Sequence, residues 1–228
     1  METLGFPTLA EDILLVLFQP DSGTIAGEDT LFHVLAGAVL ADLALDESVT
    51  ITATRTGATT IKAVEGRAPS DEILRSAWDY VSDKSVTVQT MLAVIGPTLR
   101  QPLLERLIAR GDIREENGKV LGLLKTTTLK DGGNRRRIGL INDVRAILVD
   151  GVKPTPRVAA LAGLMWGSGT FHQFDPDIPR TSVVIDRAQD LARGNWSADG
   201  ATQAFARTLA ATFSIIATNV PRGTPDTP

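Results

Sequence analysis

One stretch of the sequence constrains the fold more than any other, an apolar run at residues 31–41 that continues to residue 45. Ten of its first eleven residues are apolar or Gly, and His33 is the exception. The run is too short to cross a bilayer, because a spanning helix needs about 20 apolar residues. A helix that is apolar on nearly every face has to be surrounded by other helices. The sequence therefore predicts a mainly α-helical single domain around a buried central helix.

The segments on either side have the patterns of amphipathic helices and two β-hairpins. Helices are expected at residues 8–18, 70–81, 86–95, 103–110, 134–149, 155–166, 181–193 and 199–218. Thr8 and Glu11 have capping-box spacing, and Ser70 is the expected cap of its helix. Strands are expected at residues 49–54 and 59–64 and in a second hairpin at 113–124, where Asn117-Gly118 favours a tight turn.

These patterns define the expected domain limits and compartment. We expect an N-terminal extension at residues 1–7, one helical domain at 8–218 and a disordered tail at 219–228. Hydrophobic residues make up 43% of the chain, which is enough for a sizeable core. The absence of Cys excludes disulfides and thiolate chemistry. Acidic residues and no basic ones precede the first apolar stretch, unlike a secretory signal, so a cytoplasmic protein is expected.

No group of residues has the pattern of a catalytic or metal site. His33 and His172 have no ligand-like spacing, and His33 is expected to be a core or boundary histidine. Gly132-Gly133 lacks the Lys-Ser/Thr that follows in a phosphate loop. We therefore predict no catalytic residue, no metal and no cofactor. A carboxylate site around Asp175 and Asp177 is the remaining enzymatic alternative to the ordinary turn that these residues indicate.

Positive charge is concentrated in one part of an acidic chain. The net charge is −4, but residues 100–137 carry ten Lys/Arg against five Asp/Glu, a local balance of +5 that leaves −9 elsewhere. Arg135, Arg136 and Arg137 begin a helix, where they oppose the macrodipole and so do not stabilise the helix. An external anion would explain them. With Arg100 they form the predicted binding site for anionic phospholipid headgroups, where each Arg near a membrane contributes about 1 kcal/mol.

The second hairpin has two interpretations. Val120, Leu121, Leu123 and Leu124 place apolar side chains on both faces of one strand. Either the strand is buried on both sides, or one side meets another subunit, and we predict homo-oligomerisation through the 113–124 hairpin. The alternative function is a winged-helix-like DNA-binding regulator that reads DNA with the 103–110 helix and this hairpin. The sequence pI of about 5.2 and Glu115-Glu116 weigh against that alternative.

The order of these segments resembles a known family. The quoted segments are residues 8–15, the turn at 20–23, residues 35–45, residues 104–113 with the Asn117-Gly118 hairpin, and the helices at 137–151 and 157–166. Together they resemble the Golgi phosphoprotein 3-like family, whose yeast and animal members are phosphatidylinositol 4-phosphate effectors, and in particular its bacterial branch. The resemblance extends from about residue 8 to residue 217.

The resemblance implies a helical fold without enzymatic activity. It also implies peripheral membrane association through a basic pocket for phosphoinositide headgroups, a membrane-protein client and an apolar hairpin that supports oligomerisation. Ala36 and Pro97 stand where eukaryotic members have pocket arginines, which implies altered headgroup chemistry on the same scaffold. The expected function is thus a non-enzymatic peripheral membrane adaptor.

Overall fold

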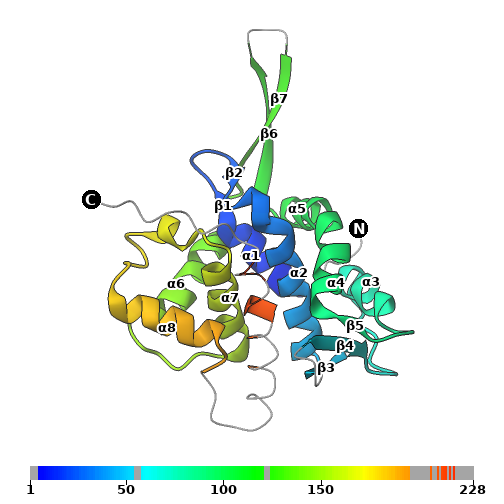
Figure 1. Cartoon of the computed structure of the whole chain (residues 1–228). Helices are drawn as coiled ribbons and strands as arrows, with labels where there is room; N and C mark the ends of the chain where they lie inside the picture. The colour runs from blue at the N-terminus through cyan, green and yellow to red at the C-terminus, as the bar shows by residue number, and fades with distance from the viewer. Residues whose placement is uncertain are drawn as a thin grey trace.

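The computed structural model describes residues 5–53, 58–120 and 124–195, and the single positions 206, 210, 212–214, 216 and 218. Its centre is α2 (Glu28–Leu45), whose side chains from Val34 to Leu43 are all buried. Among the described residues, the α-helices that pack against α2 include α1 (Leu9–Leu17), α3 (Glu72–Tyr80), α4 (Val88–Ile95), α5 (Arg100–Ala109) and α7 (Pro156–Gly167) (Figure 1). The predicted central helix and mainly α fold are confirmed, and the reason is the one expected: a helix apolar on every face needs cover on every face.

Local capping signals set where the helices begin. The Thr8 hydroxyl accepts a hydrogen bond from the Glu11 amide at 3.1 Å, and the Glu11 carboxylate accepts one from the Thr8 amide at 2.8 Å. This is the predicted capping box. The cap of α3 is Asp71 and not Ser70, because the Asp71 carboxylate accepts the Ile73 and Leu74 amides at 3.0 and 3.1 Å. An anionic cap also complements the positive end of the helix.

The second half of the chain adds α6 (Arg136–Leu148), α7, the short 3-10 helix η2 (Phe171–Phe174) and α8 (Ser182–Ala192). The described positions between 206 and 218 are helical. Among them, Phe213 and Ile216 are buried. Phe213 packs against Gly163 of α7, where a Cβ would lie 2.4 Å from the ring. Ile216 packs against Gly37 of α2, where a Cβ would lie 2.6 Å from the side chain. The described helical residues from 206 to 218, called the last helix below, therefore pack closely on α2 and α7, because Gly37 and Gly163 have no side chain there. The tail at 219–228 lies outside the described residues.

Within the described ranges, three small antiparallel sheets lie beside the helices. The first pairs β1 (Phe18–Gln19) with β2 (Thr24–Ile25). The second has the order β3 (Val49–Ala53), β4 (Thr59–Ala63) and β5 (Val86–Thr87), so residues 86–87 form a strand before α4 begins. A 3-10 helix, η1 (Gly96–Thr98), joins α4 to α5. Among the described residues no helix is both long enough and apolar enough to span a bilayer.

The third sheet is a long hairpin of β6 (Ile113–Val120) and β7 (Leu124–Asp131), which projects from the helical body (Figure 1). The predicted hairpin exists, but its predicted turn is wrong. Asn117 pairs with Thr127 and Gly118 with Thr126, so both lie inside β6. A turn at Asn-Gly would leave the β-branched residues 126–128 without a partner strand, whereas the observed register pairs eight residues on each side.

Two glycines fix the base of this hairpin on the body. A Cβ on Gly132, just after β7, would lie 1.8 Å from the Gly111 carbonyl oxygen. In the β1–β2 turn, a Cβ on Gly23 would lie 2.7 Å from the Leu129 carbonyl oxygen. Gly23 also has a φ of 72°, a conformation that disfavours other residues. The hairpin is thus held close to its neighbours by backbone contacts at its root.

Candidate functional site

The start of α6 brings the three consecutive arginines into different environments. Arg135 is exposed and occupies the N-cap position with a left-handed φ of 62°, and its own side chain does not cap the helix. Asn134 Oδ1 accepts the Arg136 amide at 3.1 Å instead. Arg136 points inward, where its guanidinium forms ion pairs with Asp12 of α1 and with Asp112. Both carboxylates are buried, so Arg136 joins α6 to α1 and to the residue that precedes β6.

Arg137 lies between these extremes. It is partly buried and forms no ion pair within 4 Å in the described part of the chain, and its Nε is buried with no hydrogen-bond partner there. Burial lowers the pKa of Arg137, and the negative charges of Asp131, Asp177 and Asp21 act in the opposite direction. Its charge is therefore offset by acids at longer range. Its two Nη groups donate to no described residue, whereas Nε is buried.

Arg100, the fourth predicted residue, lies apart from this group. It begins α5 and forms a two-bond ion pair with Glu28 at the start of α2, at 2.6 Å (Nη2–Oε1) and 3.2 Å (Nε–Oε2). Figure 1 shows α5 and α6 on opposite sides of α1. The pair is about half exposed, so Glu28 is within reach of solvent and of competing anions. The structure thus brings together Arg135, Arg136 and Arg137 but not Arg100.

The surface of α5 bears on the DNA-binding alternative. Its other arginine, Arg106, is bonded to Asp71, and Arg110, at the C-cap, is bonded to Glu11. The exposed residues of the helix are Gln101, Pro102, Glu105 and Ala109, none of which is cationic. Duplex DNA binding depends on cations that neutralise phosphates. The 103–110 helix that the winged-helix alternative would use for reading DNA therefore presents no exposed cation.

The predicted oligomerisation residues cannot be placed. Leu121 and Leu123 lie outside the described residues. The backbones of Val120 and Leu124 form the last paired positions of the hairpin, but their side chains are also outside what is described.

A network of ion pairs that the sequence analysis did not predict lies under the N-terminal end of α1. Arg110 donates to the Glu11 carboxylate at 2.6 Å and to the Gly5 carbonyl at 2.8 Å. Arg157, in the first turn of α7, donates to Asp12 at 2.5 Å and to the Pro7 carbonyl at 2.8 Å. The available signal was the Glu11-Asp12 pair inside an otherwise apolar helix, because buried carboxylates need cationic partners.

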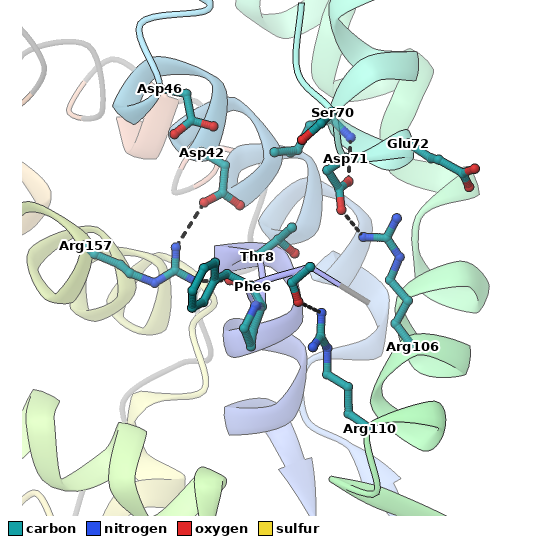
Figure 2. A pocket seen from close by; sticks show the side chains of 13 residues that line it. Phe6, Thr8, Asp42, Asp46, Ser70, Asp71, Glu72, Arg106, Arg110 and Arg157 are labelled. Carbon is teal, nitrogen blue, oxygen red and sulfur yellow. Dashed lines mark hydrogen bonds and ion pairs between the residues drawn. The ribbon is translucent and has the colours of Figure 1, made fainter. Parts of the chain in front are cut away.

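Arg110 and Arg157 of this network also line a cavity of about 650 Å³ between residues 5–8, α2, α3, α5 and α7 (Figure 2). Asp42 of α2 lies in its wall, where one carboxylate oxygen accepts the Leu9 amide at 2.7 Å and the other accepts Arg157 at 3.3 Å. Burial raises the pKa of Asp42 to about 7, against the opposing charge of Arg157 and the hydrogen bond from Leu9. Asp42 is therefore a buried acid that titrates near neutral pH.

The two histidines differ in their surroundings. His33 is half-buried on α2, its ring centroid lies 3.9 Å from that of Phe32, and desolvation lowers its pKa. His172 is exposed in η2. Within the ranges that the structure describes, no cluster of three or more His, Asp or Glu side chains is suited to hold a metal ion.

Comparison with known proteins identifies the family of this chain. No curated protein matches the chain at a significant level. The family model described as Golgi phosphoprotein 3 (GPP34) matches residues 9–208, which includes α1, the central helix, the long hairpin and α6 to α8. Since the match covers most of the 228 residues, the expected family is confirmed, and the chain belongs to the Golgi phosphoprotein 3 family.

Proposed function

We propose that this protein is a non-enzymatic peripheral membrane adaptor that binds anionic phospholipid headgroups at the start of α6. The observation that carries the proposal is the Arg137 guanidinium, which is partly buried, has an Nε without a hydrogen-bond partner and forms no ion pair in the described part of the chain. Arg135 adds an exposed second guanidinium next to it. Membership of the Golgi phosphoprotein 3 family supports the same class of function.

The geometry of α6 suits a phosphate group. The first amides of a helix carry partial positive charge and need acceptors. The Arg136 amide donates to Asn134 Oδ1 at 3.1 Å, whereas the N-cap residue Arg135 supplies no side-chain acceptor for the amides that follow. A phosphate placed there would accept these amides and would also accept charge-assisted hydrogen bonds from a guanidinium. Ile138, the third residue of α6, is 52% exposed and provides an apolar contact for the interfacial region of a membrane. Arg136 holds the site in place through Asp12 and Asp112.

Arg100 has a secondary role in this proposal. Its ion pair with Glu28 is exposed, and such pairs contribute little net stability. Arg100 can therefore exchange Glu28 for a lipid phosphate. A membrane-protein client, bound at the same time, completes the adaptor role that the family suggests.

Vesicle flotation tests the proposal. We expect the protein to float with vesicles that contain phosphatidylserine or phosphatidylinositol 4-phosphate more than with phosphatidylcholine vesicles, and less so as salt increases. Replacing Arg135 and Arg137 together with Ala is expected to weaken binding roughly 30-fold, from about 1 kcal/mol per residue.

The control is Arg145→Ala, at the far end of α6, where Arg145 pairs with Asp150 on the surface. It removes one positive charge from the same helix and should leave flotation unchanged. Equal binding to neutral and anionic vesicles, or equal losses in the control and the double variant, would overturn the proposal.

A further inference from the structure

We propose that the cavity between residues 5–8, α2, α3, α5 and α7 binds a small zwitterionic molecule, with its ammonium group on Asp46 and Asp42 and its acidic group on Arg106. This site is separate from the lipid site on α6 and does not depend on it. The cavity of about 650 Å³ lies within the size range of pockets for small-molecule ligands, roughly 300–1,000 Å³.

Opposite charges enter this cavity from different helices. Asp42 and Asp46 come from the C-terminal end of α2, whereas Arg106 comes from α5. In Figure 2, Thr8 lies between them and Phe6 lies beside Arg157. No ion pair within 4 Å joins Asp46 to Arg106 or to another described residue. The two charges face the same cavity and do not neutralise each other directly.

Both ends retain unused hydrogen-bonding capacity. Arg106 uses Nη1 for its bond to Asp71, and its Nε and Nη2 donate to no described residue. The Asp46 carboxylate is exposed and accepts no hydrogen bond from the described residues. Asp42 uses one hydrogen bond on each oxygen, although a carboxylate has about four acceptor positions. Donors and acceptors are therefore available on opposite sides of one space.

The mixed lining favours a ligand that carries both signs of charge. The cavity is lined by four carboxylates and three guanidinium groups, from Asp42, Asp46, Asp71, Glu72, Arg106, Arg110 and Arg157. A simple anion would face the carboxylates, and a simple cation would face the arginines. Pro7, Leu74 and the fully exposed ring of Phe6 supply apolar contacts for the connecting chain. A zwitterion with a short apolar spacer matches all of these groups.

A matched set of three compounds tests the inference on the full-length protein. 4-Aminobutyrate carries both charges, butylamine carries only the ammonium group, and butyrate carries only the carboxylate. In titrations followed by amide chemical shifts in NMR, we expect saturable binding of 4-aminobutyrate below about 10 mM, because each charge-assisted contact is worth roughly tenfold in affinity. The single-charge compounds should bind at least about tenfold more weakly. Glycerophosphoethanolamine, compared with phosphatidylethanolamine vesicles, shows whether a free molecule or a lipid headgroup is preferred.

Two conservative variants locate the contacts. Asp46→Asn removes a charge that has no described partner and should lower the affinity for 4-aminobutyrate about tenfold. Its neighbour Glu47 pairs with Arg67 and does not line the cavity, so Glu47→Gln is the matched control and should bind normally. Arg106→Lys keeps a cation for Asp71 but loses the unused donors, and should weaken 4-aminobutyrate without changing butylamine binding.

Thermal unfolding verifies that each variant is folded. Equal affinities for the three compounds, no binding of 4-aminobutyrate by the wild type, or a loss in Glu47→Gln that equals the loss in Asp46→Asn would overturn the inference.

Discussion

At the scale of single residues, Asp42 combines burial with several partners of mixed charge. Arg157 and the Leu9 amide favour its ionised form, whereas burial, Asp12 and Asp46 favour the neutral form. Burial is the largest of these effects and raises the pKa from 3.8 to about 7. The folded protein therefore holds this proton across a pH range in which the unfolded chain has released it.

The sign of the pH dependence follows from that difference. Between about pH 4 and pH 7 the folded state binds more protons than the unfolded state, so this group's contribution to the free energy of unfolding decreases as pH rises, by up to about 1.4 kcal/mol per pH unit. Asp42→Asn should remove this decrease. Urea unfolding of both proteins at pH 5 and pH 8 measures it. His33, whose lowered pKa acts in the opposite sense, is present in both proteins and cancels in the comparison. Identical pH profiles would contradict the assignment.

Arg135 and Arg136 are neighbours in sequence with opposite expected roles. Arg136→Met leaves the buried carboxylates of Asp12 and Asp112 with fewer cationic partners, and should cost about 3–5 kcal/mol of unfolding free energy. Arg135→Met, at an exposed position, should change stability by less than about 0.5 kcal/mol. Chemical denaturation of the two variants tests the contrast. Similar losses in both would mean that Arg136 is not an internal crosslink.

At the scale of elements, close packing of the last helix depends on the absence of side chains at two positions. Gly163 of α7 faces Phe213, and the missing Cβ is what allows the ring to approach. Gly139 of α6 has no atom within 4 Å of its own hypothetical Cβ. The same substitution should therefore have opposite effects on two helices of one protein.

Gly163→Ala should destabilise the protein by about 1–3 kcal/mol, because a Cβ at 2.4 Å forces the ring to move. Gly139→Ala should stabilise it by roughly 0.4–1 kcal/mol through lower entropy of the unfolded chain. Melting temperatures of the two variants, compared with the wild type, give the answer directly. A neutral Gly163→Ala would show that the last helix does not pack on α7 as described.

The elements also show which features a sequence can predict. The central helix and the Thr8 capping box were predictable because their signals are local. The Asn117-Gly118 turn was predicted wrongly for the same reason, since a local turn preference was outweighed by the longer pairing with Thr126 and Thr127. The partners of Arg136 were not predictable, because Asp12 lies 124 residues away and nothing in either segment specifies the other.

At the scale of the whole molecule, part of the basic segment at residues 100–137 forms ion pairs inside the protein. Three arginines of this segment have buried or half-buried carboxylate partners. Arg106 pairs with Asp71, the N-cap of α3, while Arg110 and Arg136 pair with Glu11 and Asp12 of α1. The charge asymmetry of the sequence therefore overstates the basic surface of the folded protein. Arg135 and Arg137, by contrast, form no ion pair in the described part of the chain.

Self-association is the remaining prediction at this scale. If the apolar residues of the long hairpin meet a second copy, sedimentation velocity at roughly 30 µM should show a dimer or larger species, a concentration well above that of a micromolar dissociation constant. Leu121→Asp should then give a monomer. Thr127→Asp adds the same charge at an exposed position of the same hairpin and should leave the assembly intact. A monomeric wild type would refute the prediction.

The glycine contacts at the root of the hairpin have a mechanical consequence. Gly132 contacts Gly111, and only a few residues separate the end of β7 from Arg135. The hairpin and the start of α6 are therefore fixed to the helical body at the same place. If the arginines of α6 bind an anionic membrane as proposed, this common base sets the direction in which the hairpin points relative to that membrane. A side chain at Gly132 would change the direction of the hairpin without replacing any residue of the hairpin strands or of α6.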